Sequence, residues 1–239
     1  MAERTDKHNF QERFGAQGII TLKEIASFYR ETEPSVPSTT VNWRAHSLVQ
    51  SGVLHRTGKG LYQLGEKQPF APKADVRMEK IGRLVSRRFP FISYCLWDLS
   101  CVNYFSRHLI NFNVQLVDVE RDAVDSVYYA LKENFPKAMS IHSLYGHLSD
   151  FDKAVFVRPL VTESPVRKAD GLPMATLEKI LVDMATDKEL ASFQGSEIYT
   201  IFGTAFEKYA INRSTLIRYA SRKHKKAEIE NIINSINRQ

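Results

Sequence analysis

The sequence predicts an α+β protein in which a small N-terminal domain, residues 1–68, precedes a mixed α/β domain, residues 75–239, that ends in several helices. Three observations predict this division. Helical hydrophobic spacing in residues 21–50 leads into the sharply turned segment LHRTGKGLYQL. The stretch GEKQPFAPKAD, with two prolines and no periodicity, is typical of a linker. Beyond it, strand-like and helical patterns alternate before a long helical C-terminal part.

Composition sets the broad class of the protein. The 239 residues carry 33 Lys and Arg against 27 Asp and Glu, a net charge of +6, which is compatible with nucleic acid or an acidic partner but requires neither. No apolar run reaches the roughly 18 residues of a membrane span, and MAERTDKHNF lacks the apolar core of a signal peptide. We therefore expect a cytoplasmic protein with no membrane partner. Its two cysteines, Cys95 and Cys101, should be reduced and buried.

The first domain opens with two predicted helices. Residues 10–14 are expected to end a short first helix. The apolar positions of the next helix recur at i, i+3, i+4 and i+7 and are Leu22, Ile25, Ala26 and Tyr29. Thr21 is the expected N-cap of this helix. Pro34 and Pro37 then break the helical pattern, because proline cannot continue a helix.

A third helix and a hairpin complete the first domain. The segment STTVNWRAHSLVQSG places four apolar residues on one side, namely Val41, Ala45, Leu48 and Val49. Gly52 is its expected C-terminal stop. Two β-prone arms then close around Gly58-Lys59-Gly60. Helices, a short proline turn, a further helix and a hairpin follow in the order of a winged helix-turn-helix, in which the hairpin is the wing.

The exposed side of the third helix suits DNA. A recognition helix buries one stripe and presents the other to the major groove. The residues expected at the groove are Ser38, Thr39, Thr40, Trp43, Ser47 and Gln50. We expect Arg44, Arg56 and Lys59 to hold phosphates. In the alternative interpretation, the winged helix is a protein-interaction module with Trp43 packed against the second domain.

The second domain alternates helix and strand. VRMEKIGRLVSRRF is an amphipathic helix, and FISYCLWDLSCVNYF indicates a strand to about Tyr94 and then a short helix. NVQLVDVE is a strand, RDAVDSVYYALKENF a helix, and AMSIHS and KAVFVRPLVTE are strands. The remainder is helical from MATLEKILVDMAT onward. Four terminal helices should cover the sheet or form a bundle beside it.

Two groups of His, Asp and Glu residues are candidate metal sites. One consists of His142, His147, Asp150 and Asp152, whose spacing matches no standard site and favours a polar loop. The other consists of Asp118, Glu120 and Glu163, which suggest a nuclease-like metal cluster. Acids at strand ends are more often solvated, and no matching lysine motif stands nearby. We therefore expect no metal and no cofactor.

A third dense group of charges, Glu178, Lys179 and Asp183 in LEKILVD, is most simply a buried or interfacial ion pair. The chain contains no phosphate-binding glycine loop, no Gly-x-Ser-x-Gly and no convincing Cys-His pair. The sequence therefore predicts a protein that is not an enzyme.

The strongest charge pattern is a basic stripe near the C-terminus. Its members are Arg218, Arg222, Lys225 and Lys226, and no acid follows Arg213 until Glu228. Such a stripe suits DNA phosphates or an acidic partner protein. A solvated helix face normally includes interleaved acids, which this stretch lacks. A solvated face is nevertheless an alternative of equal weight to a binding surface.

Three segments together resemble the AbiEi-type antitoxins, which are bacterial proteins with an N-terminal winged helix and a C-terminal antitoxin domain. The segments are TVNWRAHSLVQSGVLHRTGKGLYQL, LPMATLEKILVDM and SFQGSEIYTIFGTAFEKYAINRSTLIRYASRK. The resemblance covers roughly Thr21 to Lys223. The matching positions in the DNA-binding unit are Trp43, Arg44, Arg56, Lys59 and Tyr62, and those in the antitoxin domain are Glu178, Lys179 and Asp183.

The resemblance implies a cytoplasmic repressor of its own operon that also counteracts a nucleotidyltransferase-like toxin. Its expected partners are double-stranded operator DNA and a cognate toxin protein. Two alternatives stay open. One is a winged-helix regulator whose second domain senses a small ligand without any toxin. The other is a metal-dependent nuclease or nucleotidyltransferase that uses Asp118, Glu120 and Glu163.

Overall fold

The structure is a computed structural model that describes most of the chain. The described ranges are 10–15, 17–50, 53–65, 69–71, 73–107, 109–111, 113–140 and 152–236. The chain folds as two compact units. One comprises Met1–Pro69 together with Phe206–Thr215, and the other comprises Phe70–Ala205 together with Leu216–Gln239.

The first unit has the element order of a winged helix. Residues 10–14 are helical, as the sequence predicts, and precede strand β1 (Ile20–Thr21), which the sequence analysis does not predict. The remaining elements are α2 (Leu22–Thr32), α3 (Ser38–Gln50), β2 (Leu54–Gly58) and β3 (Leu61–Leu64). The three strands form an antiparallel sheet in the order β1-β3-β2. The core beneath α2, α3 and the sheet includes Phe10, Ile25, Val41, Ala45 and Leu54.

Local chemistry fixes where α2 begins. Thr21 accepts a hydrogen bond from the backbone N–H of Glu24 at 3.2 Å, and the Glu24 carboxylate accepts one from the backbone N–H of Thr21 at 2.7 Å. This capping box satisfies amide groups that the first helical turn leaves without partners. It confirms Thr21 as the N-cap. The N–H of Leu22 also donates to the carbonyl of Gly60 at 2.8 Å, which ties the tip of the hairpin to the start of α2.

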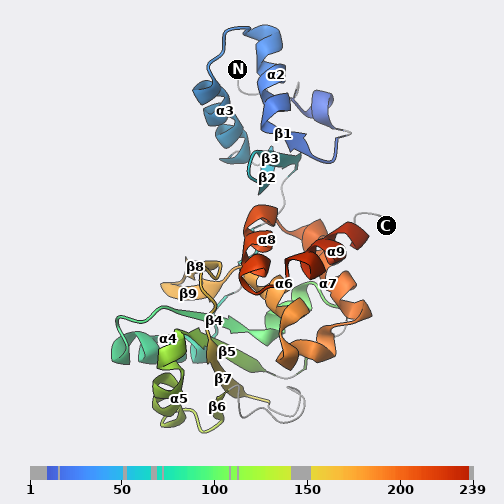
Figure 1. Cartoon of the computed structure of the whole chain (residues 1–239). Coiled ribbons are helices and arrows are strands. Elements are labelled where there is room, and N and C mark those ends of the chain that lie inside the picture. The colour runs from blue at the N-terminus through green and yellow to red at the C-terminus, as the bar shows by residue number, and fades with distance from the viewer. Residues whose placement is uncertain are drawn as a thin grey trace. The chain divides into compact units, whose positions relative to one another are not determined.

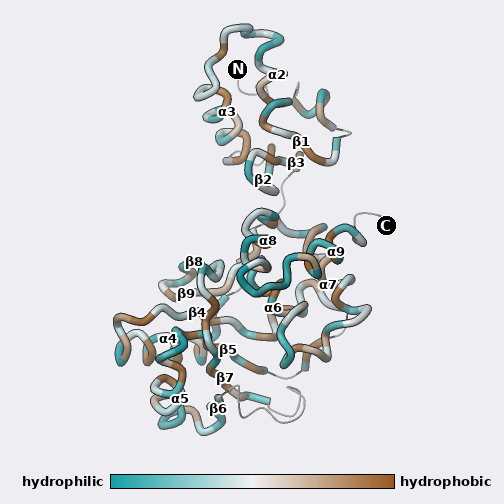
Figure 2. The backbone as a smooth tube through the Cα atoms, in the orientation of Figure 1, coloured by the Kyte–Doolittle hydropathy of each residue, from teal (hydrophilic) through white to brown (hydrophobic). Residues whose placement is uncertain are grey.

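The second unit is built on a six-stranded mixed sheet (Figure 1). The strands are β4 (Tyr94–Asp98), β5 (Val114–Val119), β6 (Ala138–Ser140), β7 (Ala154–Pro159), β8 (Val166–Ala169) and β9 (Leu172–Ala175). Their order is β6-β7-β5-β4-β9-β8. Strand β5 runs parallel to β7 and antiparallel to β4. Every residue of β5 is buried, and Figure 2 shows that hydrophobic residues predominate along β7.

Helices cover both faces of this sheet. On one face, α4 (Val76–Arg88) and α5 (Val124–Lys132) pack against the strands through a core that includes Met78, Ile81, Val117, Val127 and Val157. The opposite face carries the C-terminal helices (Figure 1). They are α6 (Leu177–Thr186), α7 (Ser196–Lys208), α8 (Arg213–Arg222) and α9 (Lys226–Ile236). The short 3-10 helices are Leu99–Tyr104, Arg121–Ala123 and Lys188–Phe193.

Most of the elements predicted for this unit are confirmed, but one strand is displaced and one hairpin is not predicted. The helices from residue 76, from residue 124 and at the C-terminus are confirmed, as are the strands around β5 and β7. The strand expected to reach about Tyr94 instead begins there. The hairpin of β8 and β9 is not predicted by the sequence analysis, which assigns no element to residues 164–173 and begins the next helix at Met174. Its turn is Asp170-Gly171, where both residues have positive φ, of 51° and 78°.

Two further expectations concern the whole described chain. Both cysteines are free and buried, as predicted. Burial raises the pKa of the Cys95 thiol to about 12 and also raises that of Cys101, so both thiols stay protonated at neutral pH. None of the described helices has the length and apolar character that crossing a membrane requires.

Candidate functional site

Helix α3 divides cleanly into a buried and an exposed face. Val41, Ala45 and Leu48 are buried in the core of the first unit. The expected groove residues lie outside this stripe: Ser38 and Thr39 are exposed, Thr40 and Ser47 are half-buried, and Trp43 is 69% exposed. The side chain of Gln50 and the whole of Gly52 lie outside the described residues. Helix α3 contains no Asp or Glu, so its surface offers nothing of its own to repel a phosphate.

Arg44 has an internal partner that the sequence analysis did not foresee. Its guanidinium Nη2 donates to both carboxylate oxygens of Glu33, at 2.8 and 3.0 Å. The same guanidinium lies over the ring of Tyr29, 4.7 Å from its centroid. Arg44 therefore links the end of α2 to α3, and a phosphate would have to compete with Glu33 for it.

The wing presents two exposed cations. Arg56 lies opposite Tyr62 on β3, and its Nε donates to the carbonyl of Gly58 at 3.0 Å. Lys59 is exposed at the tip, and no ion pair is recorded for it within the described part of the chain. Gly60 follows with a φ of +71°, which a side chain rarely tolerates. The tight turn thus carries Lys59 on a backbone that is held to α2 through Gly60.

A second candidate lies inside the other unit, where strand alternation turns two charged residues inward. Along β5, Leu116 and Asp118 face the side of α6, whereas Val117 and Val119 face α4 and α5. Asp118 pairs in register with Arg158 on the neighbouring parallel strand β7. Both side chains are almost fully buried.

Helix α6 completes this group from above the sheet. Lys179 and Asp183 are four residues apart and therefore share one face of α6. Residues from α8 and from the segment after α6 surround them. We define the charge cluster as Asp118, Arg158, Lys179, Asp183, Asp187, Glu189, Tyr219 and Lys223.

The cluster is densely hydrogen-bonded. Arg158 forms a two-pronged pair with Asp118, with Nε–Oδ1 and Nη2–Oδ2 distances of 2.6 and 3.0 Å. Lys179 Nζ lies 2.5 Å from a carboxylate oxygen of Asp118 and 2.5 Å from one of Asp183. Asp183 also accepts from the Tyr219 hydroxyl at 2.9 Å and from Lys223 Nζ at 2.7 Å. Such multiple pairing compensates the cost of removing these charges from water.

Arg158 and Lys223 extend the cluster toward its half-buried rim. Arg158 Nη1 donates to Asp187 at 3.0 Å and to Glu189 at 3.1 Å. Lys223 pairs with Asp187 as well as with Asp183. The cluster thus joins β5, β7, α6 and α8 around one polar centre.

The pKa values in the cluster follow from this arrangement. Burial favours the neutral form of Asp118, but Arg158 and Lys179 outweigh it and hold its pKa below the usual value. Burial at Asp183 is likewise outweighed, by Lys179 and Lys223, and its pKa is also lowered. Burial and then the neighbouring Asp183 raise the pKa of Asp187 to about 6. Three cations face four carboxylates here, so one carboxylate is left undercompensated.

The residues of the LEKILVD motif separate in the structure. Lys179 and Asp183 form the buried ion pair that the sequence favoured, whereas Glu178 is half-buried at the first turn of α6. Sequence reasoning missed Arg158; it placed Tyr219 on the core-facing side of its helix and counted Lys223 among the basic residues, but assigned neither to this cluster. A signal for Arg158 did exist, because an arginine within the apolar run of KAVFVRP requires a buried partner.

The acids Asp118, Glu120 and Glu163 do not assemble the metal cluster of the nuclease-like alternative. Asp118 is engaged by Arg158 and Lys179, Glu120 accepts a hydrogen bond from the Ser93 N–H at 2.8 Å, and Glu163 pairs with Arg222. Across the described ranges, no group of three His, Cys, Asp or Glu side chains is placed to hold a metal ion. Of the other proposed ligands, His142, His147 and Asp150 lie outside the described residues. Asp152 accepts from the backbone N–H of Asn113 at 2.9 Å.

The basic stripe is interleaved with acids contributed partly by another segment. Arg222 pairs with Glu163, whose second oxygen lies 4.0 Å from Arg218. Within α9 and its start, Lys225 pairs with Glu228 at 2.8 Å, and Lys226 pairs with Glu230 at 3.7 Å. The stripe therefore resembles a solvated, ion-paired face more than a bare row of positive charge.

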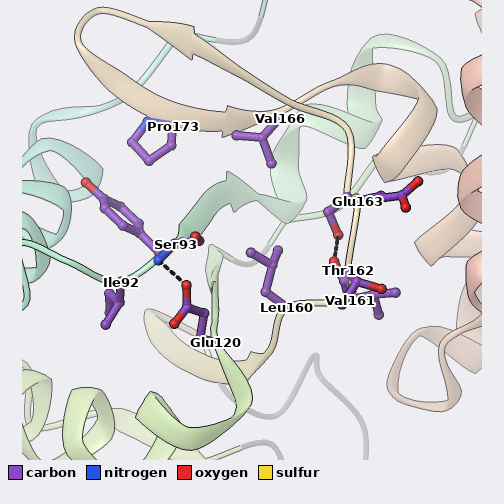
Figure 3. A pocket seen from close by; sticks show the side chains of 11 residues that line it. Ile92, Ser93, Glu120, Leu160, Val161, Thr162, Glu163, Val166 and Pro173 are labelled. Atoms are coloured by element: carbon purple, nitrogen blue, oxygen red, sulfur yellow. Dashed lines mark hydrogen bonds between the residues drawn. The ribbon is translucent and has the colours of Figure 1, made fainter.

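A cavity of about 550 Å³ opens at the edge of the sheet where β5 and β7 end (Figure 3). Leu160, Val166 and Pro173 form much of its apolar wall, and Glu120 lies at its rim. Ligands of open α/β sheets bind at the carboxyl ends of parallel strands, and this volume is in the usual range for small molecules.

Comparison with known proteins places the chain in a family. No curated protein matches its sequence. One family, described as a family of unknown function (DUF6577), matches residues 40–239. This match extends from α3 through the wing and across the whole second unit, including every member of the charge cluster. The chain belongs to the DUF6577 family of unknown function.

Proposed function

We propose that the protein is a DNA-binding transcriptional repressor of its own operon. The observation that carries this proposal is the acid-free face of α3, with exposed Ser38, Thr39 and Trp43, next to a wing that presents Arg56 and Lys59. Small hydroxyl side chains at a helix start reach base edges and phosphates, and wing cations hold the DNA backbone. Acting on chromosomal DNA, the protein would work in the cytoplasm.

We further propose that the second unit is the antitoxin part and counteracts a nucleotidyltransferase-like toxin. The resemblance of LPMATLEKILVDM and RYASRK to AbiEi-type antitoxins supports this proposal. The shared motif contributes Lys179, Asp183, Tyr219 and Lys223 to the charge cluster, where their side chains are engaged with one another. In this proposal, the motif maintains the fold of the antitoxin unit.

The repressor proposal is tested by the affinity for DNA from just upstream of the protein's own gene. Fluorescence anisotropy with this DNA and with random DNA of equal length, across a salt series, measures both preference and salt dependence. We expect tighter binding to the upstream DNA and an affinity that falls steeply with salt. Equal affinity for both DNAs at every salt concentration contradicts a repressor.

The antitoxin proposal is tested in cells. Production of a nucleotidyltransferase-like toxin encoded beside this gene should arrest growth, and co-production of the full chain should restore it. The variant Lys59→Ala should restore growth equally well, because neutralisation does not need the wing. Persistent arrest with normal levels of soluble chain contradicts the antitoxin role while leaving the repressor proposal standing.

The cavity at the sheet edge favours a second candidate, a regulator whose second unit senses a small ligand. A metabolite that raises the melting temperature and changes operator affinity would support this candidate. Val166→Arg places a long side chain in the cavity and should abolish both effects. Val76→Arg, at a 68% exposed position on α4, is the matched control and should abolish neither. A thermal shift that survives Val166→Arg excludes the cavity as the sensor.

A further inference from the structure

Trp43 is exposed, and it does not belong to the core of the first unit. The inward stripe of α3 is complete without it, since Val41, Ala45 and Leu48 supply the buried contacts. An indole ring that is 69% exposed leaves a large apolar area in contact with water. Tryptophan is enriched among the residues that anchor binding interfaces, so an exposed indole on this face is a candidate contact residue.

The surroundings of Trp43 indicate the kind of partner. Thr39, Trp43 and Ser47 follow at intervals of four residues and therefore share one helix face. This face carries hydroxyl groups beside the indole and no acid, and the same unit carries the exposed cations Arg56 and Lys59. Hydroxyls and cations suit a polyanion, whereas a docking surface for protein is normally more apolar at its centre.

The indole itself has no means of binding phosphate strongly, because it carries no charge and only one N–H donor. It must therefore bury its ring against an apolar part of the DNA. In the major groove, the apolar group that base edges display is the 5-methyl of thymine.

We propose that Trp43 packs against a thymine 5-methyl group in the major groove and makes the protein select thymine at a fixed position of its operator. This inference rests on the proposed DNA binding and deepens it by naming a base and the residue that reads it. Burial of one methyl group corresponds to about a fourfold change in affinity.

The test replaces single thymines of the upstream DNA by deoxyuridine, which pairs identically but lacks the methyl group. Footprinting first delimits the bound segment. We expect the wild-type Kd to rise about fourfold for deoxyuridine at one or two positions of each half-site. Trp43→Ala should bind more weakly and should lose this sensitivity, whereas Trp43→Phe should keep part of it. Phe91→Ala, at a 96% exposed aromatic position in the second unit, is the matched control and should behave as wild type.

The outcomes separate this inference from the function on which it rests. Equal wild-type affinity for upstream and random DNA removes the proposed repressor role, and this inference with it. Preference for the upstream DNA combined with indifference to every deoxyuridine overturns the inference alone. The inference is also overturned if replacing thymine by deoxyuridine weakens binding of Trp43→Ala as much as it weakens binding of the wild type. Another residue would then contact the methyl group. Circular dichroism and the melting temperature of Trp43→Ala confirm that the variant is folded.

Discussion

The two units use positive charge in opposite ways. On the wing, Arg56 and Lys59 are exposed, and each stands within reach of solvent and of any approaching anion. In the second unit, the side chains of Arg158 and Lys179 are only 6% and 2% exposed, and carboxylates of the same chain surround both. Both pairs consist of one arginine and one lysine, but the wing pair faces solvent and the buried pair faces carboxylates of the same chain.

This difference separates charge that binds from charge that holds a fold. A buried cation with several internal carboxylates cannot be given to an external ligand without leaving those carboxylates unpaired. An exposed cation exchanges water for phosphate at little cost. The dense charges of LEKILVD therefore indicate a structural role, while the two isolated cations of the wing are available to an external anion.

Removing one charge from the charge cluster tests this comparison with the largest expected effect. Asp183→Asn removes the carboxylate that Lys179, Lys223 and Arg158 share, and we expect the second unit to lose about 3–5 kcal/mol of unfolding free energy. Urea titration measures this loss through the buried Trp97 in a Trp43→Phe background, because the chain has two tryptophans.

The matched control is an ion pair with the same i,i+4 spacing on a helix surface. Glu79 and Arg83 on α4 are paired at 2.7 Å, and Arg83 is 76% exposed. Glu79→Gln should cost no more than about 0.5 kcal/mol. Comparable losses from Asp183→Asn and Glu79→Gln would show that the cluster contributes no more than surface charge does.

The pH dependence of stability offers a second, smaller effect. The pKa of Asp187 is raised from its ordinary value of 3.8 to about 6. The contribution of Asp187 to the free energy of unfolding is therefore fully present below pH 3.8 and is lost as the pH rises through 6. The lowered pKa values of Asp118 and Asp183 act in the opposite sense, so their contributions are present above pH 4 and are lost at more acidic pH. The free energy of unfolding of the second unit should therefore be highest between the acid-side loss below pH 4 and the loss that occurs as the pH rises through 6.

Between pH 5 and 7.5, the contribution of Asp187 to the free energy of unfolding should fall by about 1.4 kcal/mol. Asp187→Asn removes this group from the titration, and urea midpoints at a series of pH values measure the result. We expect the variant to lose the decline toward neutral pH and to keep the acid-side decline. Parallel wild-type and variant profiles would contradict a titration of Asp187 in this range.

A third effect should appear in the first unit, in sequence discrimination. Thr40→Val keeps the shape of the side chain and removes its hydroxyl, which we expect to cost about 1 kcal/mol on upstream DNA and much less on random DNA. The ratio of the two affinities, measured at one salt concentration, should fall roughly fivefold. Thr162→Val, at an exposed position of the second unit, is the control. Equal losses on both DNAs would assign Thr40 to phosphate contact.

Most of the fold could be predicted because its elements carry local signals. The spacing of Leu22, Ile25 and Tyr29 with the Thr21 cap defines α2 regardless of what packs on it. The β8–β9 hairpin shows the limit. Its Asp-Gly turn was readable, but its arms VRKA and LPMA are short, and one contains Pro173. Pairing of β9 with β4, which is tertiary, stabilises it.

The candidate sites were predictable to a smaller extent for the same reason. The exposed face of α3 follows from helical periodicity alone, and so does the shared face of Lys179 and Asp183. The pairs Arg44–Glu33, Arg158–Asp118 and Arg222–Glu163 join separate segments, over 11 and 40 residues in the first two cases. No pattern within one segment specifies such partners, so Arg44 and Arg222, which the sequence analysis offered to DNA, proved to have acids of their own.

The most direct test of the distinction between binding charge and structural charge is the salt dependence of operator binding by the double variant Arg56→Ala/Lys59→Ala. The matched control, Lys80→Ala/Lys168→Ala, removes two exposed cations from the second unit. We predict that the wing variant binds all DNA more weakly, with a salt slope reduced by about 2, while its unfolding free energy and the control's binding stay at wild-type values. Unchanged affinity and slope in the wing variant would contradict the assignment of the wing to DNA.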